Sequence, residues 1–140
     1  MARHRGWVWV LAAAGLSAGC GPAPTAPDDT GSREAVRGFY EAVLAQDWPR
    51  AYRFLHPVSQ GRTSPEQFAD RARNYRRSLG LEPEAVRLRS CEEHGTEAVA
   101  HVVLTGRAGR QTYKDAITLR RNGAEWGVVL PPSFGKARPQ

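Results

Sequence analysis

The chain has 140 residues, of which 41% are hydrophobic and 24% are charged, and its formal net charge is +6. This length is enough for one ordinary domain with one hydrophobic core and excludes a second domain of similar size. The positive charge is mild and comes almost entirely from arginine, so it gives no reason to expect a nucleic-acid partner.

The first 20 residues have the organisation of an export signal. Residues 1–6 are basic, an apolar run extends from Trp7 to Leu16, and small residues lead to Cys20. The apolar run is much shorter than the roughly 20 residues that a transmembrane helix needs. These features are typical of a secretory signal peptide. An ordinary signal peptide, cut after residue 18 or 19, would leave Cys20 as a free thiol or a disulfide partner.

The segment from Leu16 to Cys20 also resembles the lipobox of bacterial lipoproteins. The resemblance implies a signal peptide at residues 1–19 and lipid attachment, including palmitate, at Cys20, which becomes the mature N-terminus. The protein would then be exported and anchored to the bacterial membrane by its lipid. Gly21 follows the cysteine, where many inner-membrane lipoproteins have aspartate, so in a Gram-negative cell the resemblance implies the periplasmic face of the outer membrane.

The rest of the chain divides into a tether, a domain and a tail. Residues 20–31 are rich in proline and small side chains and cannot form a core, so we expect a semi-extended tether. Residues 32–133 form the predicted domain, and residues 134–140 a flexible tail. The domain contains one cysteine, Cys91, so its stability must come from packing. We expect Cys91 to be buried as a small hydrophobic residue, with an intermolecular disulfide as the alternative.

Helical patterns fill the first part of the domain. Ser32 is a candidate cap for a helix in which apolar residues recur at spacings of three and four as far as Leu44. The sequence Asp47-Trp48-Pro49 interrupts this helix, because proline disfavours a helical residue before it and is tolerated in the first turn of a new helix. We expect a short second helix that stops at residues 56–57.

A third helix has the clearest local signal in the domain. Ser64 provides a capping hydroxyl, Pro65 occupies the first helical position, and Gln67 stands three residues after the cap. Gly80 supplies the left-handed residue that commonly follows the end of a helix.

After residue 83 the apolar pattern alternates, which indicates strands at about 84–93, 96–106, 111–121 and 124–130. Asn122-Gly123 predicts a hairpin with a type I′ turn between the last two strands. The second strand is apolar on both of its faces, so we expect it in the middle of the sheet with both faces covered.

Helices followed by strands predict an α+β fold, with three N-terminal helices packed on a curved four-stranded antiparallel sheet. The segment 36–57, with its adjacent aromatic residues, acidic turn and final Leu-x-Pro, resembles the opening of NTF2-like (cystatin-like, SnoaL-like) domains. The helix start at 64–68 and the strand at 126–130 also fit that family. The resemblance implies a cone, in which a bent sheet wraps around a long helix and encloses a pocket.

Two strands carry residues suited to acid–base chemistry. His101 lies on the second strand, and Tyr113 and Asp115 share one face of the third. If the strand register turned all three toward the cone, His101 would be a general base, Asp115 would orient it and Tyr113 would donate a hydrogen bond. The alternative is that His101 and Asp115 face solvent. Candidate pocket residues are Tyr40, Tyr75, His101, Tyr113 and Trp126, whose aromatic members are equally suited to filling the core.

The histidines and Cys91 do not have the spacing of metal ligands, so we expect no metal and no cofactor.

We favour an envelope lipoprotein whose non-catalytic domain binds a protein partner or a small apolar ligand. The first alternative is an exported isomerase or dehydratase that uses His101 and Asp115. The second is a structural module that forms homodimers through the exposed face of its sheet.

Overall fold

The computed structural model describes residues 29–136. The predicted signal peptide, Cys20, most of the predicted tether and the last four residues of the predicted tail lie outside the described residues. Within 29–136, no helix is long and apolar enough to cross a membrane.

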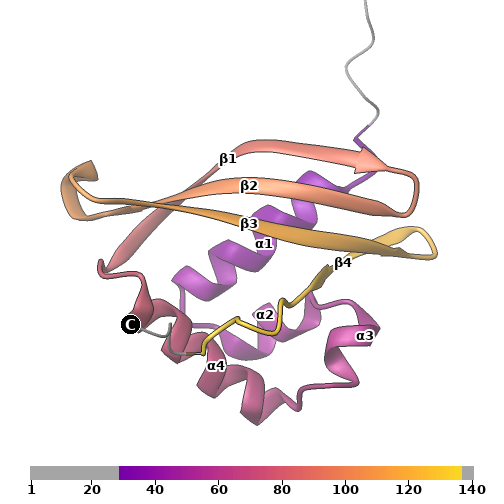
Figure 1. The fold of residues 1–140 in the computed structure, drawn as a ribbon, viewed down its shortest axis with the longest axis horizontal. Helices are drawn as coiled ribbons and strands as arrows, with labels where there is room; N and C mark the ends of the chain where they lie inside the picture. The colour runs from indigo at the N-terminus through magenta and orange to yellow at the C-terminus, as the bar shows by residue number, and fades with distance from the viewer. Residues whose placement is uncertain (1–28, 137–140) are drawn as a thin grey trace, which may run out of the picture.

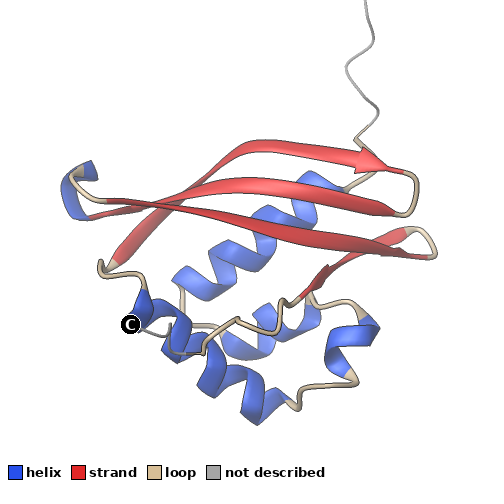
Figure 2. Ribbon diagram, viewed as in Figure 1, coloured by secondary structure: helices blue, strands red, loops and turns tan. Residues whose placement is uncertain are grey.

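Helices come first and strands follow, as the sequence predicts. The elements are α1 (Ser32–Leu44), α2 (Trp48–Arg53), α3 (Pro57–Gln60), α4 (Pro65–Ser78), β1 (Pro83–His94), β2 (Glu97–Gly106), the short 3-10 helix η1 (Arg107–Gly109), β3 (Thr112–Asn122) and β4 (Glu125–Val129). The strands form one antiparallel sheet in the order β1-β2-β3-β4. The sheet is curved, α1 crosses beneath it, and the other helices form a further layer on the same side (Figures 1 and 2). This arrangement confirms the predicted α+β fold class.

The structure adds α3 to the three predicted helices. The helical stretch through α2 stops before Pro57, as expected, but this proline then occupies the first turn of α3. His56 caps the new helix, because its Nδ1 accepts a hydrogen bond from the backbone N–H of Val58 at 3.2 Å. His56 also donates its own backbone N–H to Val128 O at 2.8 Å, which attaches this segment to the edge of β4.

The start of α1 differs from the prediction. Its N-cap is Gly31, which has a φ of 111°, and Ser32 is the first helical residue. The Ser32 hydroxyl donates to Glu93 Oε1 on β1 at 2.6 Å, and the backbone N–H of Thr30 donates to the same oxygen at 3.0 Å. The domain therefore begins at Thr30, within the predicted tether, and a carboxylate from the sheet accepts the hydrogen bonds at this helix start.

The capping signal of α4 is confirmed. Ser64 Oγ accepts from the backbone N–H of Gln67 at 3.2 Å, and the Gln67 side chain accepts from the backbone N–H of Ser64 at 3.1 Å.

The last hairpin is also confirmed, but its turn type is not. Asn122 pairs with Glu125, so the central turn residues are Gly123 and Ala124, and of these only Gly123 has a positive φ. A type I′ turn requires positive φ at both positions.

Strand register decides which residues face the helices. β2 is a central strand, as predicted, with its even-numbered residues Ala98, Ala100, Val102 and Leu104 buried against the helices. The prediction that both faces of this strand are covered is wrong, because Val99 on the outer face is 41% exposed. Cys91 on β1 is buried, as expected, with its Sγ 3.2 Å from Ser32 Oγ.

The segment after β4 is part of the core, so the predicted boundary at residue 133 is wrong. Phe134, the first residue of the predicted tail, is 5% exposed. Arg71 of α4 holds this segment, because its guanidinium donates to Phe134 O at 2.9 Å and to Pro131 O at 3.3 Å. Gly135 then passes so close to the backbone of Arg71 that a Cβ on Gly135 would collide with it.

Candidate ligand-binding site

Aromatic rings fill the middle of the cone. The ring of Phe134 stacks on Tyr75 with centroids 4.7 Å apart, and it lies parallel to Phe68 at 6.2 Å. Phe39 of α1 contacts both Phe68 and Phe134, with centroids 6.4 and 6.3 Å away. The space that the family resemblance assigned to a pocket is therefore largely occupied by side chains from α1, α4 and the C-terminal segment.

A single carboxylate borders this aromatic cluster. Asp115 of β3 accepts two hydrogen bonds on Oδ2, from the phenol of Tyr40 at 2.8 Å and from the phenol of Tyr75 at 2.6 Å. Its other oxygen, Oδ1, accepts from the backbone N–H of Ala116 at 2.9 Å. Tyr40 belongs to α1 and Tyr75 to α4, so these two hydrogen bonds join both helices to the sheet. A hydrogen bond to an ionised group contributes about 1.5–3 kcal/mol.

The two phenols remain donors over the ordinary pH range. Burial is the largest cause that raises the pKa of Tyr40, followed by the proximity of Tyr75 and of the Asp115 carboxylate. Burial and then the charge of Asp115 likewise raise the pKa of Tyr75 well above its usual value. Because a phenolate beside Asp115 would place two negative charges together in a buried site, both hydroxyls keep their protons.

A pocket of about 320 Å³ opens beside this carboxylate. We call it the mouth pocket. Tyr75 and Ser78 of α4 line one side, Tyr113 and Asp115 of β3 line another, and Phe134 and Lys136 of the C-terminal segment complete it. Its walls therefore combine aromatic rings with one acidic and one basic side chain.

The structure separates the predicted His101–Asp115 pair, so that prediction is wrong. His101 is exposed and lies opposite Ala116 on the outer face of the sheet, whereas Asp115 lies opposite Val102 on the face that the helices cover. Side chains alternate between the faces of a strand, so the one-residue difference in register places the two groups on opposite sides. Tyr113 does share the inner face with Asp115, as the sequence predicts.

The other predicted pocket residues divide between two places. Tyr75 and Tyr113 line the mouth pocket, and Tyr40 reaches Asp115 from the core. Trp126 lies at a different place in the sheet, opposite Arg121 on β3. Its indole Nε1 donates to Thr30 Oγ1 at 2.8 Å, so Trp126 connects β4 to the residues that precede α1. Trp126 does not line the mouth pocket.

Sequence analysis missed Phe134 and Lys136, which it assigned to the flexible tail. The available signal was a large aromatic residue followed by glycine, with the aromatic residue two positions after the second of the two prolines at 131–132. The backbone carbonyls of a short terminal segment that carries a buried aromatic ring need hydrogen-bond donors. Here Arg71 donates to the carbonyls of this segment, and nothing in the sequence pairs that arginine with residue 134.

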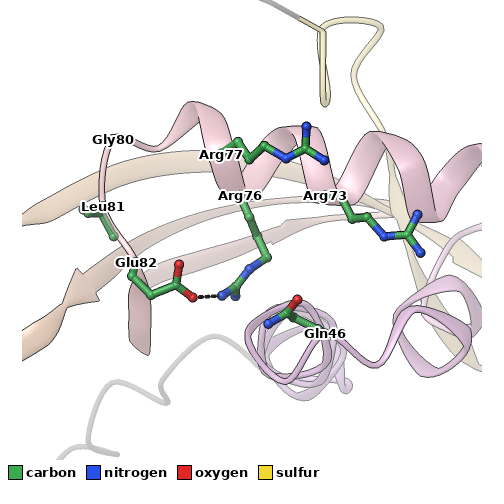
Figure 3. A pocket seen from close by; sticks show the side chains of 7 residues that line it. All are labelled: Gln46, Arg73, Arg76, Arg77, Gly80, Leu81 and Glu82. Carbon is green, nitrogen blue, oxygen red and sulfur yellow. Dashed lines mark hydrogen bonds and ion pairs between the residues drawn. The ribbon is translucent and has the colours of Figure 1, made fainter.

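A second hollow, of about 580 Å³, lies where the C-terminal ends of α1 and α4 meet. Arg76 is 8% exposed and donates to the last carbonyls of α1, Val43 O at 3.2 Å and Leu44 O at 3.1 Å. Figure 3 shows its guanidinium turned toward Glu82, with which it forms an ion pair, while Arg73 and Arg77 extend away from this pair. The arginines of α4 therefore do not converge on one anion site.

The outer face of the sheet carries charged residues among its apolar ones. Arg87 of β1 and Lys114 of β3 are exposed on this side, and Val99 is the large hydrophobic residue most exposed within 29–136. The homodimer through this face stays a prediction, and charged side chains interrupt the apolar surface that it would use. Among the described residues, no group of three or more His, Cys, Asp or Glu side chains is placed to hold a metal ion.

No family model and no curated protein matches the sequence. Solved structures do match the fold. A Campylobacter jejuni protein named as an NTF2-like transpeptidase superposes with a TM-score of 0.54 at 9% identity, covering 71% of this chain and 97% of that one. The fold is NTF2-like. A SEC-C motif containing protein from Rhodopseudomonas palustris matches the NTF2-like domain with a TM-score of 0.51 at 14% identity, over 72% of this chain and 77% of that one. At such identities the likeness concerns the fold alone.

Proposed function

We propose that this protein is an exported, lipid-anchored envelope protein whose NTF2-like domain binds a small ligand in the mouth pocket without catalysing a reaction. One observation carries the proposal. The interior of the cone is filled by stacked aromatic rings, and the mouth pocket of about 320 Å³ lies against a carboxylate that accepts hydrogen bonds from two phenols. This volume is near the lower end of the range for small-molecule sites, so the ligand is small.

The hydrogen bonds of Asp115 support a binding role. General acid–base catalysis commonly pairs the base with a second group that orients it or exchanges its proton. Asp115 uses Oδ2 for two phenol donors and Oδ1 for a backbone N–H, while His101 lies on the opposite face of the sheet. The mouth pocket therefore offers a fixed charge and shaped apolar walls, which are features of recognition.

A variant that fills the pocket tests the binding role. Ser78 is exposed on α4 and lines the pocket, so Ser78→Phe would place a ring in it. Glu66→Phe, at an exposed position in the first turn of the same helix, is the matched control. We expect saturation-transfer NMR with a panel of phenol, indole, benzoate, choline and 3,3-dimethylbutan-1-ol to detect binding to the wild type and to Glu66→Phe, with loss in Ser78→Phe. No binding by any compound, or equal binding by all three proteins, would contradict the proposal.

Lipid anchoring is tested on the full chain. The full-length wild-type protein, expressed in a Gram-negative host that is supplied with labelled palmitate, is expected to carry the label and to fractionate with membranes. Cys20→Ala should lose both properties. Cys91→Ala is the control because Cys91 is the other cysteine of the chain and is buried in the domain, so the label should remain. Retention of label in Cys20→Ala would refute anchoring at this residue.

A further inference from the structure

The mouth pocket contains the negatively charged side chain of Asp115. Asp115 forms no ion pair among the described residues, and its hydrogen bonds from Tyr40, Tyr75 and the backbone of Ala116 come from neutral donors, two phenols and one amide. Its Oδ1 accepts one hydrogen bond, whereas a carboxylate oxygen can accept two. The Asp115 carboxylate thus brings a negative charge and one unused acceptor position to the wall of the pocket.

The walls beside this charge are aromatic. Tyr75, Tyr113 and Phe134 all line the pocket that Asp115 lines. The face of an aromatic ring attracts a cation by about 0.5–2 kcal/mol, more strongly where the cation has lost water. Rings and a carboxylate around one small pocket form an environment that stabilises an organic cation more than a neutral or anionic molecule of the same shape.

From this arrangement we propose that the ligand of the mouth pocket is a small alkylammonium compound, bound with its cationic group beside Asp115 and against the rings of Tyr75 and Tyr113. This inference rests on the proposed binding function and specifies its ligand class. A quaternary ammonium group fits best, because its methyl groups suit apolar walls and it needs no hydrogen-bond acceptor. A neutral ligand that places only apolar groups beside the carboxylate would remove water from it without replacing the lost interaction.

Lys136 allows a test of whether the bound ligand carries a positive charge. Lys136 is one of the residues that line the pocket, so its positive charge opposes a bound cation electrostatically. Lys114 lies next to Asp115 in the sequence, but on the outer face of the sheet. Removing the charge of Lys136 should therefore strengthen binding of a cation, whereas removing the charge of Lys114 should change it little.

The decisive experiment compares two ligands of one shape. Choline and 3,3-dimethylbutan-1-ol differ in that a quaternary nitrogen replaces a quaternary carbon, so the first is a cation and the second is neutral. Calorimetric titration of the domain is expected to give an affinity for choline at least tenfold higher than for the alcohol. Asp115→Asn, which keeps an oxygen acceptor for the two phenols, should remove most of this preference. Circular dichroism would show whether this variant folds.

The lysine variants keep the test decisive if Asp115→Asn does not fold. Lys136→Gln is expected to bind choline several-fold more tightly than the wild type, and Lys114→Gln to stay within twofold. Equal affinities for choline and the alcohol, or weaker choline binding by Lys136→Gln, would overturn the ammonium inference and leave the proposed binding function standing. Absence of binding by every compound of the panel would overturn both.

Discussion

The phenol of Tyr75 on α4 donates a hydrogen bond of 2.6 Å to Asp115 Oδ2 on β3, two residues that are 40 positions apart in the sequence. This contact connects the outer helical layer to the sheet at the mouth of the cone. It also places the Asp115 carboxylate at the floor of the mouth pocket, with Tyr75 contributing a wall of the same pocket. One hydrogen bond thus serves both the fold and the candidate site.

Alkaline pH should destabilise the domain through ionisation of Tyr40 and Tyr75. Their pKa values are raised in the folded state, so the stabilisation is fully present below the unfolded value of about 10 and is lost as pH rises above it. Each group contributes a slope of up to about 1.4 kcal/mol per pH unit. Urea unfolding between pH 8 and 11.5 should show this decline, with a shallower slope in Tyr75→Phe. An unchanged slope in that variant would contradict the role assigned to Tyr75.

Acid pH should lower the free energy of unfolding through protonation of Glu93, which contacts the start of α1. Burial opposes ionisation of this carboxyl, but hydrogen bonds from Ser32 and Thr30 prevail and hold its pKa below the usual value. Its contribution is therefore present above the unfolded pKa of about 4.3 and is lost as pH falls through the lower folded value. We expect Glu93→Gln to lower the free energy of unfolding at pH 7 by about 1–2 kcal/mol and to flatten its decline below pH 4.5.

Glu92 is the control for Glu93, because it is the neighbouring carboxylate and is exposed. Glu92→Gln should change the free energy of unfolding by less than about 0.5 kcal/mol. If both variants lose the same stability at pH 7, the hydrogen bonds at the start of α1 do not explain the effect.

The C-terminal segment can be tested with two glycines of similar backbone geometry. Gly135 and Gly80 have φ of 67° and 71°, but a Cβ on Gly135 would collide with the backbone of Arg71, whereas a Cβ on Gly80 would meet nothing within 4 Å. Gly80→Ala should cost about 1 kcal/mol from backbone strain alone. Gly135→Ala should cost at least about 2 kcal/mol more, because Phe134 loses its packing. Equal costs in chemical denaturation would show that this segment is not held as described.

Arg76 and Arg77 form a second pair of neighbours with different expected effects. Arg76 is buried and donates to the last carbonyls of α1, whereas Arg77 is exposed. Arg76→Met should reduce the free energy of unfolding by about 2 kcal/mol, since it leaves helix carbonyls without donors. Arg77→Met should stay within about 0.5 kcal/mol. Similar losses in the two variants would assign the effect to the net charge of α4.

Local signals predicted the elements well, and long-range contacts account for the differences. The capping box at Ser64 and the hairpin after Asn122 depend on residues close in sequence, and both are present. Ser32 does not cap α1 as the sequence suggested, because its hydroxyl donates instead to Glu93, which is 61 positions away. The candidate His101–Asp115 pair failed because alternation fixes which residues share a face of one strand, but not how neighbouring strands are aligned.

Protein-observed NMR tests the central claim most directly, because it locates the ligand. Amide spectra of the labelled domain would be recorded with the compound of the panel that binds most tightly. The account predicts shifts concentrated at residues 75–78, 113–117 and 131–136, around the mouth pocket. Shifts centred on the outer face of the sheet around His101, or no shifts with any compound, would contradict it.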